Sequence, residues 1–180
     1  MNLESIANKV SREMIEEKTP IDNPVVIALV GLQYSGKSTL ATQIANHNFA
    51  HFWATKIKKD YSLANEEMIT VSGFVIKRLI EEGFSVVMDY VNQAKIMRES
   101  LHKIARDSGA GYELVYLDIP KEERLRRRSL NEEEGETPGR RLISLDQMQS
   151  FEDNFETPEA YENPIILRDQ NDIDNFLKSL

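Results

Sequence analysis

The chain has 180 residues, of which 41% are hydrophobic and 29% charged, with a formal net charge of −8 and no cysteine. This length fits one domain that buries its own core. The lack of cysteine excludes disulfides, thiolate metal sites and cysteine nucleophiles, and the negative charge opposes nonspecific attraction to nucleic acid or an anionic membrane.

Residues 1–24 are expected to form an amphipathic helix, ending near Thr19, and a connector with two prolines. Apolar residues recur there at steps of three or four, as on a helix face that packs against a domain. They are Leu3, Ile6, Val10 and Met14. No apolar stretch in the chain reaches the length of a membrane span or a signal peptide, so we expect a cytoplasmic protein without membrane contact.

Residues 31–38 read Gly-Leu-Gln-Tyr-Ser-Gly-Lys-Ser and fit the phosphate-binding pattern G-x-x-x-x-G-K-[ST] at every fixed position. They follow an apolar run at 25–30, which predicts a strand, and precede an amphipathic helix. A strand, loop and helix in this order aim backbone N–H groups and the positive end of the helix dipole at one spot. We therefore expect Lys37 to reach the β and γ phosphates of ATP and Ser38 to ligate Mg²⁺. The predicted nucleotide-binding residues are Gly31, Gln33, Tyr34, Ser35, Gly36, Lys37, Ser38 and Thr39.

Strands and helices are predicted to alternate over the rest of the chain. Alternation implies parallel pairing, and mostly apolar strands imply a sheet covered on both faces. The predicted fold is therefore an α/β protein, a three-layer α/β/α sandwich over residues 25–180. Expected strands lie at 49–54, 84–88, 112–117 and 165–167, expected helices at 65–82, 93–107, from Pro120 onward and at 172–180, and a polar stretch at 131–139.

Ligands of such sheets bind beyond the carboxyl ends of the strands. Asp89 is the most informative residue there, because it ends a buried apolar strand, where an unpaired carboxylate is costly. A Mg²⁺ ion held by Ser38 and the phosphates would compensate the charge of this carboxylate. Alternatively, Asp89 accepts the proton of a substrate hydroxyl or caps the next helix. The next residue is Tyr90 rather than a glutamate, which favours phosphoryl transfer over hydrolysis.

A strongly charged helix follows Pro120, and Asp118 is expected to cap it. Arginines on a closing lid stabilise the charge that phosphoryl transfer spreads over the moving group. Nearby glutamates leave a second interpretation open, a solvated helix face with internal ion pairs. The arginines in question are Arg124, Arg126, Arg127, Arg128, Arg140 and Arg141, of which Arg124, Arg127 and Arg128 are predicted to act in catalysis together with Lys37 and Asp89.

Residues 52–59 lie at the rim where an acceptor would bind. Phe52 and Trp53 are expected in the core rather than as a base-stacking platform. Lysines follow at 56, 58 and 59, either to bind an anionic substrate or as ordinary surface residues. The three histidines at 47, 51 and 102 are too scattered to predict a metal site.

With these residues in place, the chain resembles the small P-loop kinases of the adenylate kinase-like superfamily, nearest those related to polynucleotide 5′-hydroxyl kinase, zeta toxin and chloramphenicol phosphotransferase. The resemblance implies five parallel strands, a lid at about 120–145, ATP with Mg²⁺, and transfer of the γ-phosphoryl group to a hydroxyl of a small molecule or a nucleic acid 5′ end. The matching motifs are the glycine loop at 31–38, Val-Val-Met-Asp at 86–89, Tyr-Leu-Asp-Ile-Pro at 116–120 and Phe-Glu-Thr-Pro at 155–158.

One position departs from that family. Its kinases carry an aspartate, followed three residues later by an arginine, just past the second strand, and the aspartate acts as base on the acceptor hydroxyl. Here Thr55 and Lys58 take those places. Either Asp60 or Asp89 substitutes as the base, or the acceptor chemistry differs. A regulatory or switch-type ATPase and an ATP-binding protein without phosphoryl transfer are the alternatives.

Overall fold

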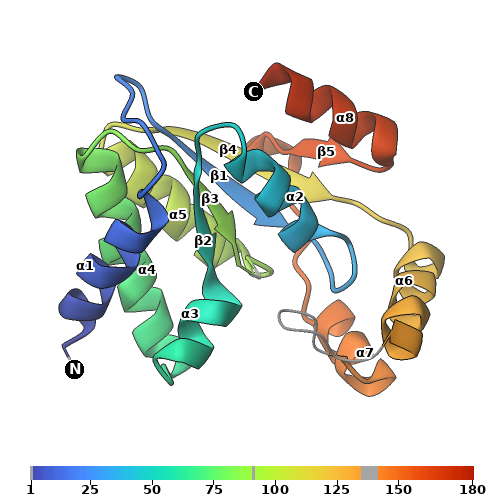
Figure 1. Ribbon diagram of the computed structural model, residues 1–180. Helices are drawn as coiled ribbons and strands as arrows, with labels where there is room; N and C mark the ends of the chain where they lie inside the picture. The colour runs from blue at the N-terminus through green and yellow to red at the C-terminus, as the bar shows by residue number, and fades with distance from the viewer. Residues whose placement is uncertain (1, 91, 135–141) are drawn as a thin grey trace.

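The computed structural model describes residues 2–90, 92–134 and 142–180. Its centre is a five-stranded parallel sheet in the order β2-β3-β1-β4-β5, with helices on both faces (Figure 1). This confirms the predicted α/β/α sandwich. The strands are β1 (Val25–Val30), β2 (Ala50–Trp53), β3 (Val86–Asp89), β4 (Gly111–Leu117) and β5 (Ile165–Leu167). The helices are α1 (Leu3–Met14), α2 (Lys37–Ala45), α3 (Ala54–Asp60), α4 (Asn65–Glu81), α5 (Lys95–Asp107), α6 (Lys121–Glu134), α7 (Leu145–Asp153), α8 (Gln170–Ser179) and the 3₁₀ helix η1 (Ala160–Glu162).

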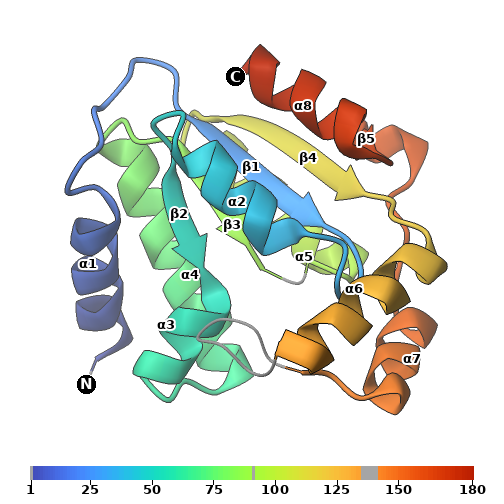
Figure 2. The ribbon, with the colours of Figure 1, turned by 45° about the vertical axis from the view of Figure 1, so that its right-hand side comes forward.

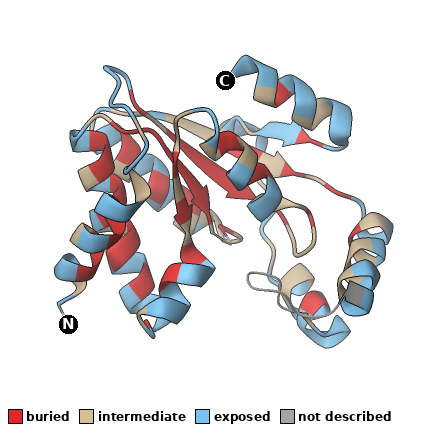
Figure 3. Cartoon of the chain, in the orientation of Figure 1, coloured by how far each residue is buried: buried red, intermediate tan, exposed pale blue. Residues whose placement is uncertain are grey.

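The central strand β1 contributes side chains to a hydrophobic core on each face of the sheet. Val26, Ala28 and Val30 pack into the core under α1, α4 and α5. Ile27 and Leu29 pack into the core under α2 and α8, because successive side chains of a strand point to opposite faces. Figure 2 shows α2 and α8 on one side of the sheet and α4 and α5 on the other. The inner strands β1 and β3 are buried, whereas the edge strand β5 and the outer helix faces are largely exposed (Figure 3).

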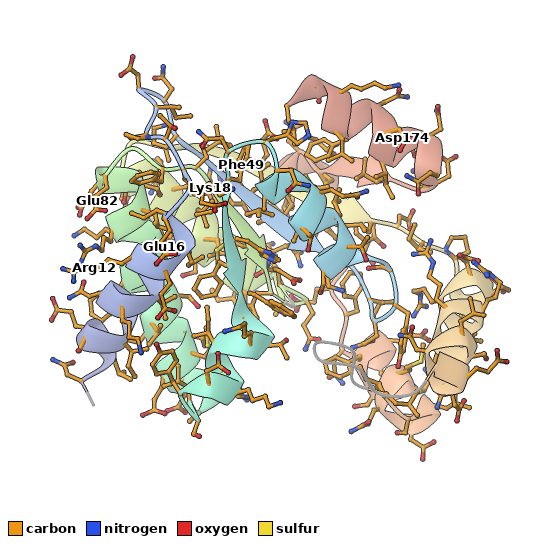
Figure 4. All side chains as sticks on the ribbon, viewed as in Figure 1. Arg12, Glu16, Lys18, Phe49, Glu82 and Asp174 are labelled. Carbon is orange, nitrogen blue, oxygen red and sulfur yellow. The ribbon has the colours of Figure 1, made fainter. Side chains whose placement is uncertain are left out.

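The first helix packs on the sandwich, as expected, but it ends at Met14 rather than near Thr19. Two glutamates at 16 and 17 follow its carboxyl end, where negative charge opposes the helix dipole. The connector is instead fixed to the end of α2 and the turn before β2. Lys18, labelled in Figure 4, donates from Nζ to the Ala45 carbonyl at 2.7 Å. The Thr19 backbone and the Asn48 side chain exchange two hydrogen bonds.

Three local features differ from the sequence prediction or were missed by it. Residues 54–60 form a helix directly after β2, where the sequence analysis assigned no element beyond a strand ending at Ala54. The polar stretch predicted from Asn131 is helical as far as Glu134, because its glutamates favour a helix. The sequence prediction also missed α7, although Ser144 and Gln147 form a capping box at its start. Among the described residues, no helix is long and apolar enough to cross a bilayer.

Candidate nucleotide-binding site

The glycine loop between β1 and α2 is tightly folded. A Cβ atom on Gly31 would lie 2.7 Å from Ser35 Oγ and 3.0 Å from the Leu117 carbonyl oxygen, so a side chain there would displace the loop. Gly36 adopts a φ of +102°, which favours glycine, and is the N-cap of α2. The first N–H groups of α2 have no acceptor within the helix. The loop therefore carries the backbone features of an anion site.

Lys37 places its ammonium group within this loop. Its Nζ atom donates to the carbonyl oxygens of Gly31 at 2.7 Å and Leu32 at 2.9 Å. Burial lowers the pKa of Lys37 to about 8, while the nearby Asp89 carboxylate acts in the opposite direction. The positive charge thus lies where the sequence predicts a triphosphate.

Asp89 ends β3 and is 6% exposed. Its Oδ2 atom is buried without a hydrogen-bond partner and lies 3.5 Å from Nε2 of His51, which is likewise buried and unpartnered. An unpartnered buried carboxylate oxygen fits a cation or its water shell. Ser38 lies exposed in the first turn of α2. No group of three or more His, Asp and Glu side chains forms a metal site within the described chain, so Mg²⁺ would depend on the phosphates and water as well.

The three candidate arginines of α6 have different surroundings. Arg127 reaches the glycine loop and donates to the carbonyl oxygens of Ser35 at 2.9 Å and Tyr34 at 3.3 Å. Arg124 is 4% exposed and instead binds Glu152 of α7 at 2.6 Å. Arg128 donates to the Ile143 carbonyl at 2.8 Å and to Glu132 at 3.0 Å. Arg126 pairs with Glu123 on the helix surface, and residues 140 and 141 lie outside the described residues.

The loop also contacts the segment that precedes α7. The Tyr34 hydroxyl accepts a hydrogen bond from the Ile143 N–H at 2.9 Å. Tyr34 has a φ of +61°, an uncommon conformation for a residue with a side chain. Together with Arg127, this contact joins the phosphate loop to the helical pair α6 and α7, which lies beside the carboxyl end of the sheet (Figure 2).

The remaining predicted loop residues are also placed. Ser35 is buried and its Oγ has no hydrogen-bond partner, as is true of Oε1 of the half-buried Gln33. Thr39 is exposed on α2. Asp118 accepts a hydrogen bond from the Tyr116 hydroxyl at 3.2 Å and lies 3.6 Å from Arg168.

At the acceptor rim, Thr55 is exposed on α3. Lys56 pairs with Asp60 at 2.6 Å, so that carboxylate is engaged by a neighbour on its own helix. Phe52 is fully buried, as predicted, whereas Trp53 is half-buried and stacks on His51 with a ring distance of 5.9 Å.

The sequence prediction missed His51. It lies two residues before the end of β2, and β2 pairs with β3 so that Trp53 is the partner of Asp89. Side chains two apart on a strand share a face, which brings His51 toward Asp89. A histidine among the last residues of a predicted strand was a signal, but the strand order that gives it meaning was not visible.

A parallel sheet in this order, a glycine loop at the end of its central strand and a helical pair beside that loop define a P-loop nucleotide-binding protein with a kinase-like fold. The chain belongs to the family of the chromatin associated protein KTI12, whose family model matches residues 24–168. No curated protein matches the chain.

Solved structures share the fold at low sequence identity. Chaetomium thermophilum Kti12 in complex with ADP-AlF₃ is 18% identical, with 86% of this chain and 96% of that chain covered and a TM-score of 0.62. A Janibacter sugar kinase is 17% identical, with 86% and 93% covered and a TM-score of 0.66. The Mycobacterium tuberculosis APS kinase in complex with AMPPNP and APS is 17% identical, with 89% and 96% covered and a TM-score of 0.56.

Proposed function

We propose that this protein binds ATP with Mg²⁺ and transfers the γ-phosphoryl group to a hydroxyl acceptor. The observation that carries the proposal is the convergence of Lys37 and Arg127 on one glycine loop, with the Asp89 carboxylate beside Lys37. Two cations and a helix N-terminus match the charge of a triphosphate. A carboxylate without a hydrogen-bond partner on Oδ2 matches the accompanying metal.

Each residue has a defined role in this proposal. Lys37 neutralises the β and γ phosphates, and Arg127 stabilises the negative charge of the transferring group from the α6 side. Ser38 and Asp89 are the protein groups that would hold Mg²⁺. When bound there, Mg²⁺ supplies charge neutralisation at the β and γ phosphate oxygens. The Tyr34 hydroxyl contacts Ile143, whose carbonyl accepts a hydrogen bond from Arg128 of α6, so Ile143 links the loop to α6.

On the acceptor side, the alternative role of Asp89 is that of the base. Thr55 cannot act as a carboxylate base, and Asp60 is paired with Lys56. Asp89 is the carboxylate whose charge acts on Lys37. Because phosphoryl transfer has a loose transition state, positioning and charge stabilisation can suffice where the base is weak.

Hydrolysis of ATP by a regulatory protein is the second candidate. The exposed Thr55, at the place of the usual base, favours it. Membership of the KTI12 family also supports it, because that family is described by association with chromatin rather than by a substrate. The ADP-AlF₃ in the related Kti12 structure mimics a nucleotide with a phosphoryl group in transfer, which is compatible with either acceptor.

Incubation with γ-labelled ATP and Mg²⁺, with and without a library of hydroxyl compounds, tests the two candidates. A labelled organic product supports the kinase. Release of free phosphate in the same amount with and without the hydroxyl compounds supports the ATPase. Lys37→Ala should abolish turnover because the phosphates lose their main cation. Lys77→Ala is the matched control, since Lys77 is an exposed lysine that pairs with Glu81 on α4. Equal turnover in both variants would refute the role of the glycine loop.

A further inference from the structure

A second pocket lies between α1, β2 and α3, and no residue of the glycine loop lines it. Its volume is about 280 Å³, which suits a small organic ligand. Three aromatic or heteroaromatic rings contribute to its walls, together with aliphatic side chains and ionisable groups. The lining residues are His51, Trp53, Tyr61, Val10, Met14, Ile57, Glu13, Lys56 and Asp60.

The ionisable groups of this pocket favour a positive ligand. Glu13 and Asp60 supply two carboxylates, against the one ammonium group of Lys56, which pairs with Asp60 at 2.6 Å. Glu13 also faces Lys9 at 3.9 Å, outside the pocket lining. The pKa of Lys56 is raised, first by its hydrogen bond to Asp60 and also by the charges of Asp60 and Glu13. Within the pocket lining, the carboxylates therefore outnumber the ammonium groups by one.

The aromatic walls favour the same class of ligand. Trp and Tyr rings attract an organic cation through their negative faces, and they also bury a flat or apolar body. Lys9, outside the pocket lining, already places its Nζ 5.8 Å from the centre of the Tyr61 ring, so a bound cation would compete with it there. Met14 and Ile57 provide further apolar surface.

We propose that this pocket binds a small organic cation, with its apolar body against Trp53 and Tyr61 and its positive group toward Glu13 and Asp60. The pocket also adjoins the nucleotide site through one residue. His51 lines the pocket and lies 3.5 Å from Asp89. A ligand that contacts the His51 ring therefore acts on the carboxylate assigned to Mg²⁺, and by linkage each ligand alters the affinity of the other by the same factor.

The position of Trp53 gives a direct test. It is the single tryptophan of the chain, so intrinsic fluorescence reports on the pocket. Three probes share a benzyl group and differ in charge: benzyltrimethylammonium, benzyl alcohol and phenylmethanesulfonate. The cation should quench or shift Trp53 emission and bind about tenfold more tightly than the alcohol, and the sulfonate should bind least. Equal affinity for all three probes, or no response to the cation, would overturn the proposal.

Variants locate the binding. Glu13→Gln combined with Asp60→Asn should weaken binding of benzyltrimethylammonium about three- to tenfold, because the probe loses its counter-charges. Glu66→Gln combined with Glu81→Gln is the matched control, since both residues are exposed on α4 and absent from the pocket lining. Loss of binding in the control, or unchanged binding in the pocket variant, would contradict the assignment. Circular dichroism melting shows that each variant is folded.

The link to the nucleotide site is measured by calorimetry of an ATP analogue with Mg²⁺, with and without benzyltrimethylammonium. We expect a severalfold change in affinity that is equal in both directions of the cycle and lost in His51→Leu. An unchanged affinity in the wild-type protein would overturn the link. The fluorescence titration itself needs no nucleotide, so failure of the pocket and failure of the proposed phosphoryl transfer are distinguishable.

Discussion

The roles of Arg124 and Arg127 can be separated by comparing stability with turnover. Both residues lie on α6, three positions apart, and the sequence predicts catalysis for both. Arg124 is 4% exposed and donates to Glu152 at 2.6 Å and to the Ile119 carbonyl at 3.2 Å. Arg127 has 34% of its side chain exposed and donates to the Ser35 carbonyl of the glycine loop. We therefore expect Arg124 to stabilise the α6–α7 pair and Arg127 to act in the proposed nucleotide site.

The expected cost of Arg124→Ala follows from its ion pair. Removing one partner of a buried pair costs about 3–5 kcal/mol. Glu152 is 16% exposed and keeps Lys121 at 2.7 Å, so we expect a smaller loss of about 2–3 kcal/mol in the free energy of unfolding. For a chain of this size, that corresponds to a melting temperature lower by about 5–10 °C. Turnover measured well below the melting temperature should change little.

Arg127→Ala should show the opposite pattern. Its pair with Glu123 is exposed and shared with Arg126, and such pairs contribute at most about 1 kcal/mol. Removal of its charge from the transferring group should slow turnover about 10²- to 10³-fold. Thermal melting followed by circular dichroism and release of labelled phosphate provide the two measurements. If Arg124→Ala melted like the wild type but lost turnover, the division of roles would be refuted.

Three further outcomes are expected. Burial lowers the pKa of Lys37 to about 8, so the affinity for ATP measured by calorimetry should fall above about pH 8, by up to about tenfold per pH unit. The affinity of Lys37→Arg should not change over the same pH range. A wild-type affinity that is independent of pH would contradict this prediction. Asp89→Asn should reduce Mg²⁺-dependent turnover about 10²-fold or more, and wild-type rates would favour helix capping. Arg98→Met should destabilise the fold by about 3–5 kcal/mol in urea titrations, because it leaves the buried Glu162 without its bidentate partner; an unchanged midpoint would contradict this.

The fold and the glycine loop were predictable because their signals are local. An apolar strand, a loop with glycines where the backbone is crowded, and an amphipathic helix are adjacent in sequence. Gly31 is required because a side chain there would collide with Ser35 and with Leu117 of the neighbouring strand, and Gly36 is required by its positive φ. Alternating apolar strands and helices likewise indicated the layered sheet before its strand order was known.

The chemistry around the loop was decided by tertiary structure. The positions of Arg124 and Arg127 along the helix could not show which of them faces the glycine loop. The answer depends on Glu152 of α7, 28 residues beyond Arg124, which binds Arg124. His51 and Asp89 are 38 positions apart in the chain, and they become neighbours only because β2 pairs with β3. Sequence thus determined where the glycine loop forms, because the backbone geometry of the loop is set by adjacent residues. Only packing decided which distant charges face it, because those charges come from separate elements brought together by the sheet order and the α6–α7 contact.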